Sequence, residues 1–216
     1  ISAVTEDRDA GGEAGTRGEL RFYVGVFTDL SPLRRSEERA SRLALYDPLT
    51  ELPNRQRVGE WLGEAIAAAD ADGGQVTVLF IDLDRFGHIN DALGHERGDE
   101  LIAAAARRLR ACVGEGVMLA RHGSDEFVAV ATGRDAEREA EALAARVLDA
   151  LHEAFELRPG QRLHLTASIG VSVHPGDGVI AAELIQRAEA AMYDAKRAGR
   201  NLVRFYRQSL TERAGA

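Results

Sequence analysis

An apolar run that begins at Val76 ends in two alternate acidic residues, Asp82 and Asp84. Because side chains alternate along a strand, the two acids share one face at its carboxyl end. Carboxylate oxygens suit a hard cation such as Mg²⁺, and a polyphosphate could lie there without burying charge in the core. The alternative is a strand end whose acids are simply solvated, and this segment alone does not decide between the two interpretations.

A second acidic segment follows Arg121. It reads as two strands joined by a tight turn, with the adjacent acids Asp125 and Glu126 just beyond it. Gly123 followed by Ser124 fits a type II′ turn, which needs a positive φ only at its first central residue. The alternative is an ordinary hairpin tip, since acidic tips are common.

The third segment contributes cations near the end of the chain. Lys196 and Arg200 are four residues apart, so they share one helical face if the helix persists that far. Both could hold terminal phosphate oxygens. The alternative is that they only complement the dipole at the C-terminus of a helix, which requires no ligand.

The spacing of apolar residues predicts the elements that hold these side chains. Helices are expected over 54–70, 98–112, 135–152 and 180–198, and strands over 76–81, 117–122, 127–131, 163–173 and 202–206. This order mixes a hairpin with helical crossovers. It predicts an α+β fold with a single central sheet, partly antiparallel, and helices packed on it.

The N-terminal part has a different organisation. Residues 1–30 read as a two-strand hairpin, and residues 31–46 as a charged helix that is either a solvated linker or a short dimerising coiled coil. The hairpin and helix resemble the end of a PAS sensor domain that continues into its signalling helix. A main domain over 47–208 and a tail over 209–216 follow. Because the chain begins with Ile1, we expect a fragment of a longer protein.

Composition narrows the function classes. The 216 residues are 45% hydrophobic with a formal net charge of −8, which argues against nucleic-acid and anionic-membrane partners. No apolar run is long enough to span a bilayer. The single cysteine, Cys112, can form no intrachain disulfide and fits a reducing cytoplasm. The six histidines form no metal-binding pattern, so we expect them to be surface or packing residues.

Four motifs in the correct order resemble the GGDEF diguanylate cyclase family, whose domain has a nucleotidyl-cyclase-like fold. The matching segments are Asp47 to Arg55, Asp82 to Asp99, Gly123 to Phe127, and Ala191 to Asn201. The resemblance covers about residues 47–206. The combination is far more specific than any one of the motifs.

The resemblance implies roles for the acidic residues. Asp82, the carbonyl of Leu83 and Asp125 would bind the cofactor Mg²⁺ or Mn²⁺. Glu126 would support metal binding or deprotonate the attacking hydroxyl. Gly123 and Ser124 would complete the catalytic loop.

It also implies the residues that bind GTP. Asn90 and Asp99 would read guanine, because an amide oxygen and a carboxylate can accept its N1–H and amine protons and reject adenine. Asp99 could also be the N-cap of a helix after Gly98. The remaining substrate-binding residues are the backbone amides of the turn at 84–87, including Phe86 and Gly87, together with Lys196 and Arg200.

Two residues depart from the family pattern. Ser124 replaces the second glycine of the signature, and Gly87 replaces the lysine that usually follows the phenylalanine. The arginine and aspartate of the family's product-inhibition site are also missing, because Gly114 to Val117 stand in their place. We therefore expect no inhibition through that site.

The function implied is a cytoplasmic diguanylate cyclase that condenses two GTP into cyclic di-GMP and pyrophosphate as a homodimer, under the control of a sensor. The alternative is a degenerate domain that binds GTP and regulates an attached EAL phosphodiesterase domain beyond residue 216. A third reading, a purely structural dimerisation unit, does not explain why the guanine and metal residues occur together.

Overall fold

The computed structural model describes residues 44–207. These residues belong to a compact unit that begins at Arg42. The expected N-terminal hairpin, most of the linker helix and the C-terminal tail lie outside the described residues. Within the described part, no helix is both long and apolar enough to cross a membrane.

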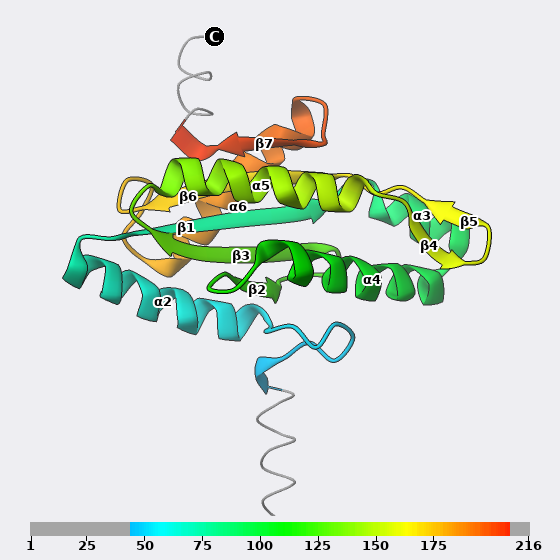
Figure 1. Ribbon diagram of the computed structural model, residues 1–216, viewed down its shortest axis with the longest axis horizontal. Coiled ribbons are helices and arrows are strands. Elements are labelled where there is room, and N and C mark those ends of the chain that lie inside the picture. The colour runs from blue at the N-terminus through cyan, green and yellow to red at the C-terminus, as the bar shows by residue number, and fades with distance from the viewer. Residues whose placement is uncertain (1–43, 208–216) are drawn as a thin grey trace, which may run out of the picture. The chain divides into compact units, whose positions relative to one another are not determined.

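A five-stranded sheet forms the centre of the domain (Figure 1), in the order β2-β3-β1-β6-β7. The strands are β1 (Gln75–Leu83), β2 (Met118–Arg121), β3 (Glu126–Gly133), β6 (Ala167–His174) and β7 (Leu202–Phe205). All neighbouring pairs are antiparallel except β6 and β7, which are parallel. The predicted single, partly antiparallel sheet is therefore confirmed.

Helices cover both faces of this sheet, as Figure 1 shows. They are α2 (Arg55–Asp72), α3 (Phe86–Leu93), α4 (His95–Val113), α5 (Ala136–His152) and α6 (Ala181–Arg197). Alternate residues of the strands feed two hydrophobic clusters, one against α4 and α5 and the other against α2 and α6. The α+β fold class is confirmed.

Strand β1 is the centre of the sheet because it is apolar on both faces. Every residue from Val76 to Leu83 is buried. Its partners are β3 on one side and β6 on the other, and its carboxyl end places Asp82 opposite Glu126 and Ser168. The carboxyl end of this buried strand therefore places the charged side chain of Asp82 where the strands of the sheet end.

A glycine on β6 fixes how closely α6 approaches the sheet. A Cβ atom on Gly170 would lie 1.9 Å from the carbonyl oxygen of Ala188 and 2.2 Å from the backbone nitrogen of Met192. Only a residue without a side chain permits this packing. Lys196 follows Met192 by one helical turn, so the same contact sets where the lysine lies.

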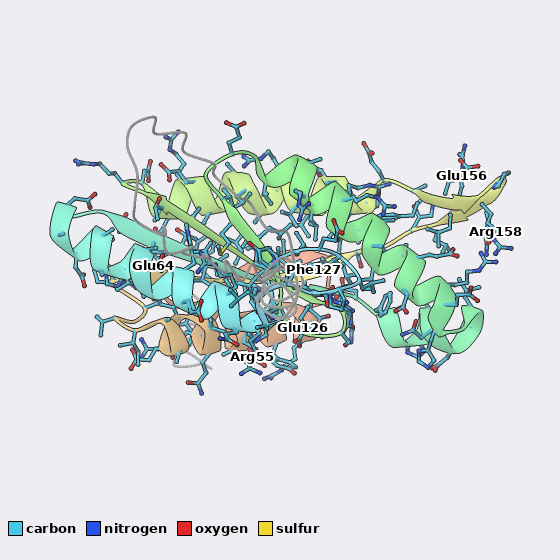
Figure 2. The ribbon with its side chains drawn as sticks, turned by 90° about the horizontal axis from the view of Figure 1, so that it is seen from below. Arg55, Glu64, Glu126, Phe127, Glu156 and Arg158 are labelled. Carbon is cyan, nitrogen blue, oxygen red and sulfur yellow. The ribbon has the colours of Figure 1, made fainter. Side chains whose placement is uncertain are left out.

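The structure contains two elements that the sequence patterns did not predict. One is α3, which begins at Phe86 where a simple turn was expected, and the other is the hairpin of β4 (Phe155–Arg158) and β5 (Gln161–Leu163). The hairpin projects from one end of the domain and carries Glu156 and Arg158 (Figure 2). Both elements are short, and short runs give weak periodic signals.

Candidate active site

The acidic residues gather at the carboxyl end of β1. Asp82 lies between Glu126 of β3 and Ser168 of β6 in the sheet register. One residue further on, the backbone N–H of Leu83 donates to the carbonyl oxygen of Asp125 at 3.1 Å. The sheet thus brings together Asp82, Asp125 and Glu126, which come from two motifs far apart in the sequence. We call this region the acidic edge.

Lys196 supplies positive charge at the acidic edge. Its Nζ lies 2.7 Å from Oδ2 of Asp82, whose side chain is 6% exposed. Burial raises the pKa of Asp82, the contact with Lys196 opposes this rise, and the charges of Asp125 and Asp84 add to it, so the pKa lies above its ordinary value. Because Lys196 pairs with a buried carboxylate, complementing the helix dipole does not by itself explain its position.

Glu126 has a raised pKa as well. Burial is the largest cause, followed by the negative charges of Asp82, Asp125 and Glu189, while Lys196 opposes the shift. A carboxylate with a raised pKa is a better proton acceptor near neutral pH than an ordinary one. The mutual repulsion of these acids also means that an added positive charge would be favourable here.

The oxygen donors at the acidic edge fit a hard divalent cation. The carboxylates of Asp82 and Asp125 and the carbonyl of Leu83 are the kind of ligand that Mg²⁺ accepts. Within residues 44–207, no group of three or more His, Cys, Asp or Glu side chains is already arranged as a metal centre. The fit therefore rests on the type of donor and on the unfavourable crowding of charge.

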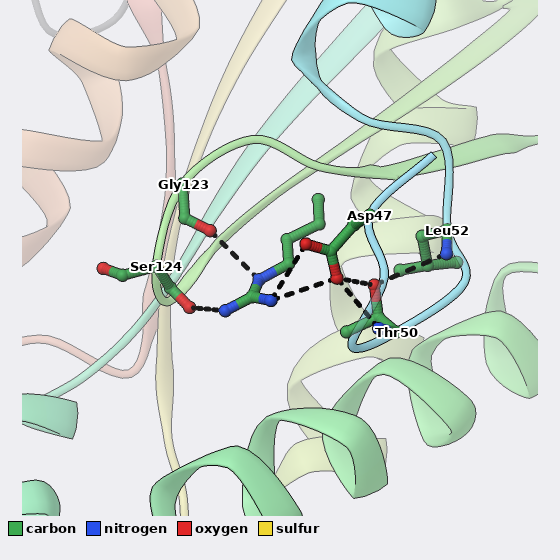
Figure 3. A network of polar contacts seen from close by, with 6 residues as sticks. Asp47, Thr50, Leu52, Gly123 and Ser124 are labelled. Atoms are coloured by element: carbon green, nitrogen blue, oxygen red, sulfur yellow. Dashed lines mark hydrogen bonds and ion pairs between the residues drawn. The ribbon is translucent and has the colours of Figure 1, made fainter. Parts of the chain in front are cut away.

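Arg121 holds the loop that leads to the acidic edge, through contacts with the labelled residues Gly123, Ser124 and Asp47 of Figure 3. Its Nε donates to the carbonyl of Gly123 at 3.1 Å and its Nη2 to the carbonyl of Ser124 at 2.7 Å. Its Nη1 donates to both carboxylate oxygens of Asp47, at 3.0 and 3.1 Å. One guanidinium thus fixes two consecutive carbonyls of the loop to the segment where the chain enters the domain.

The predicted type II′ turn at Gly123 is wrong. The loop between β2 and β3 has four residues, 122–125, and Gly123 does not have a positive φ. A Cβ atom there would lie 2.3 Å from Oε2 of Glu126, so a side chain at this position would make the carboxylate shift. The absence of a side chain at Gly123 leaves room for the carboxylate.

Ser124 affects the acidic edge through its hydroxyl. Its Oγ donates a hydrogen bond of 2.5 Å to Oδ1 of Asp125. One of the two carboxylate oxygens of Asp125 is therefore engaged by the residue that departs from the family pattern. The serine adds both bulk and a competing hydrogen bond.

Asn90 lies in a second region, where α3 faces α4. A Cβ atom on Gly98 would be 1.8 Å from Oδ1 of Asn90, so the amide packs directly on this glycine. The Oδ1 atom is buried and accepts no hydrogen bond from the described residues. A buried acceptor without a donor is costly, and a ligand N–H would satisfy it.

Phe86 lies beside this amide, and Asp99 follows Gly98 on α4. Phe86 is buried, and its Cζ would be 3.3 Å from the same Cβ on Gly98. Asp99 is exposed and lies inside α4, whose N-cap is Gly94. The alternative role of Asp99 as an N-cap is therefore wrong, because the helix begins three residues earlier than expected.

The residues expected to hold phosphate are placed around the start of α3 and the end of α6. Gly87 is exposed in the first turn of α3. Helix α6 ends at Arg197, and Arg200 follows with a left-handed backbone of φ 67°. Lys196 and Arg200 thus do not share a helical face, because Gly199 and Arg200 lead the chain into β7.

Asp84 has a role that the sequence patterns missed. Its carboxylate accepts hydrogen bonds from the hydroxyls of Thr166 and Ser168, at 2.7 and 2.6 Å, and from the backbone N–H of Asn201 at 3.1 Å. The residue is 6% exposed. Asp84 therefore joins the start of α3 to the loop that carries Arg200, and it is not available as a solvated acid.

The sequence contained weak signals for the contacts of Arg121 with Asp47 and for the hydrogen bonds to Asp84. Asp47 opens the first motif and Arg121 lies two residues before the Gly123 to Phe127 motif, so a pairing of this acid with this arginine could have been considered. Thr166 and Ser168 alternate along the predicted strand over 163–173, which places two hydroxyls on one face. Neither signal identifies its partner without the tertiary structure.

Similarity to known proteins identifies the family of this chain. The family model for the diguanylate cyclase GGDEF domain matches residues 44–202. The chain belongs to the GGDEF domain family. The resemblance drawn from the four motifs is thereby confirmed.

Relatives of this GGDEF domain include enzymes with different named activities. The chain is 39% identical over 182 residues to the bifunctional diguanylate cyclase/cyclic di-GMP phosphodiesterase MucR of Pseudomonas aeruginosa, covering 84% of this chain and 26% of MucR. It is 36% identical over 173 residues to the diguanylate cyclase TpbB of the same species, covering 77% and 39%. The chain thus spans about a quarter of the length of MucR.

Solved structures share the fold. The GGDEF domain of TpbB superposes with a TM-score of 0.72 at 34% identity, covering 74% of this chain and 94% of that one. The coiled coil and GGDEF domain of DgcB from Caulobacter crescentus, solved in complex with c-di-GMP, gives a TM-score of 0.72 at 28% identity, covering 82% and 93%.

Proposed function

We propose that this GGDEF domain is a diguanylate cyclase. The 3′-hydroxyl of one GTP attacks the α-phosphorus of a second GTP, pyrophosphate leaves, and the same step repeated on the other pair of groups closes the ring. Each domain supplies one GTP, so two domains face each other as a homodimer. The observation that carries the proposal is the acidic edge, where Asp82, Asp125 and Glu126 converge beside Lys196.

The region where α3 faces α4, which contains Asn90, binds and orients GTP in this proposal. Oδ1 of Asn90 is buried and has no donor among residues 44–207, and it accepts a proton of guanine, while the carboxylate of Asp99 accepts another. Adenine offers no N1–H and is rejected. The backbone N–H groups at the start of α3, Lys196 and Arg200 hold the phosphates.

At the acidic edge, Glu126 accepts the proton of the attacking 3′-hydroxyl. Burial and the neighbouring negative charges raise the pKa of Glu126, which makes its carboxylate a stronger base than an ordinary glutamate. Asp82, Asp125 and the carbonyl of Leu83 would hold a Mg²⁺ or Mn²⁺ ion, which when bound would offset charge on the phosphates and favour ionisation of the hydroxyl.

The test is to incubate the purified chain with GTP and Mg²⁺ or Mn²⁺ and to look for cyclic di-GMP by mass spectrometry. Asp82→Asn and Glu126→Gln are expected to lose the product, and Asp149→Asn and Glu64→Gln, at exposed positions on α5 and α2, are expected to retain it. Product from Asp82→Asn at the parental rate would contradict the assignment.

A second function is favoured by two observations. Ser124 donates a hydrogen bond to Asp125, and Gly87 stands where the family usually has a lysine. Both differences favour a domain that binds GTP without cyclising it. The relative NbdA of Pseudomonas aeruginosa, 35% identical over 185 residues, is named a cyclic di-GMP phosphodiesterase. In this alternative the domain binds GTP and regulates an attached EAL phosphodiesterase domain. GTP binding without product in the same assay would select it.

A further inference from the structure

A cavity of about 530 Å³ lies beside α3, and Asn90 is not among the residues that line it. Arg85, Ile89 and Ala92 line it, and their spacing of three and four residues places them on one side of the helix. Asn90 instead packs on Gly98 of α4. The cavity is therefore separate from the expected guanine site.

Basic groups surround this cavity. Its lining includes the guanidinium groups of Arg85 and Arg200 and the imidazoles of His88 and His164. The one acid in the lining is Asp84, whose carboxylate already accepts three hydrogen bonds. In a chain with a formal net charge of −8, this is a local site for an anion.

Three larger apolar side chains also line the cavity. Ile89 and Leu93 come from α3, and Leu163 comes from the end of the β4–β5 hairpin. All three are partly buried. A mostly apolar pocket with a few converging polar groups is typical of a site for a small organic ligand.

The backbone around the cavity is unusual. In residues 44–207, four residues other than glycine have a positive φ, and three of them line the cavity: Arg85, Arg200 and Asn201. Such conformations cost free energy and persist only where the surrounding structure holds them. The hydrogen bond from the N–H of Asn201 to Asp84 is one such restraint.

We propose that this cavity binds a nucleoside monophosphate. The phosphate pairs with Arg85 and Arg200, because a guanidinium matches phosphate oxygens with paired hydrogen bonds. The base lies over Ile89, Leu93 and Leu163. Since Arg200 is also expected to hold the phosphates of GTP, an occupant would compete for this side chain. Binding itself does not depend on whether the domain is a cyclase.

The test uses 5′-AMP as the probe and the full 216-residue chain. Adenine lacks the N1–H donor that Asn90 and Asp99 accept, so AMP discriminates between the two sites. Saturable shifts of backbone amide resonances are expected at the lining residues His88, Ile89 and Ala92 and in the segments 163–166 and 199–201, and not at Asn90 or Asp99. Arg85→Ala should weaken binding about tenfold, as expected for the loss of one charged hydrogen-bonding partner. Arg162→Ala, an exposed arginine on the same hairpin outside the lining, should leave the affinity unchanged.

Three results would overturn the proposal. They are the absence of saturable shifts at millimolar AMP, shifts centred on Asn90 and Asp99, and equal affinity of the parent chain and Arg85→Ala. Inorganic phosphate serves as a second probe. Binding of phosphate as tight as that of AMP would show that the apolar wall contributes nothing, and would reject a nucleoside ligand.

Discussion

Arg121 and Asp47 are 74 residues apart in the sequence, yet Nη1 of the arginine donates to both carboxylate oxygens of the aspartate. Both side chains are mostly buried, with 14% and 19% exposed. Burial acts to raise the pKa of Asp47, but hydrogen bonds from Thr50 and Arg121 outweigh it and leave the pKa below its ordinary value. The ion pair joins the entry of the domain to the loop at 122–125.

Replacing Arg121 by lysine should therefore impair both stability and turnover. A lysine carries the charge but cannot donate to Asp47, Gly123 and Ser124 at once. We expect a loss of about 2 kcal/mol of unfolding free energy, measured by urea denaturation. A displacement of the loop by about 1 Å should lower turnover roughly a hundredfold.

Arg57→Lys is the matched control for this change. Arg57 pairs with Glu60 on the surface of α2 at 3.4 Å, where an ion pair contributes little. Equal unfolding free energies and equal turnover in Arg121→Lys and Arg57→Lys would show that Arg121 does not couple the loop at 122–125 to the entry of the domain.

Substitutions at Ser124 separate its two effects. Ser124→Ala removes the hydrogen bond to Asp125 and keeps the Cβ atom, whereas Ser124→Gly removes both. If the hydrogen bond is the main obstacle, both variants should turn over GTP faster than the parent, by about tenfold for the loss of one competing bond to a charged group. If bulk is the obstacle, only the glycine variant should improve. Steady-state turnover and GTP affinity distinguish the two, and no gain in either variant would show that Ser124 does not limit the reaction.

Gly98→Ala tests the contact beneath Asn90. The new methyl would overlap Oδ1 of Asn90, so the amide has to move away from its position. We expect GTP to bind at least about tenfold more weakly, because one hydrogen bond to guanine is lost, with the helical circular dichroism unchanged. Gly63→Ala, in α2 with nothing near its Cβ, is the control and should bind GTP like the parent. Normal GTP affinity in Gly98→Ala would argue against Asn90 as a guanine-binding residue.

The raised pKa of Glu126 predicts a pH-dependent stability. A carboxyl whose pKa is higher in the folded than in the unfolded state destabilises the fold once it ionises. This destabilisation is absent at low pH, and it develops as the pH rises from the unfolded-state pKa through the raised folded-state pKa. Glu126→Gln should therefore raise the Tm at pH 8, on the order of 1–2 °C because the side chain is only partly buried. The gain should vanish near pH 4. A gain that is independent of pH would mean that packing, not charge, is responsible.

The sequence by itself determined the family and the order of the longer helices and of the strands of the central sheet. Long periodic runs identify α2, α4, α5 and α6, and an apolar run identifies β1, because burial of one face imposes a regular spacing on the residues. The motifs also named the acids of the acidic edge. These features are local, so a single stretch of sequence contains all the information that they require.

Only the tertiary structure decided how distant residues pair. The contacts of Lys196 with Asp82, Arg121 with Asp47, and Asp84 with Thr166, Ser168 and Asn201 each join different elements. Likewise, a side chain at Gly123 would displace the Glu126 carboxylate, which no turn type predicts. Such pairings depend on sheet register and on how closely a helix approaches the sheet, and neither is encoded in any one segment.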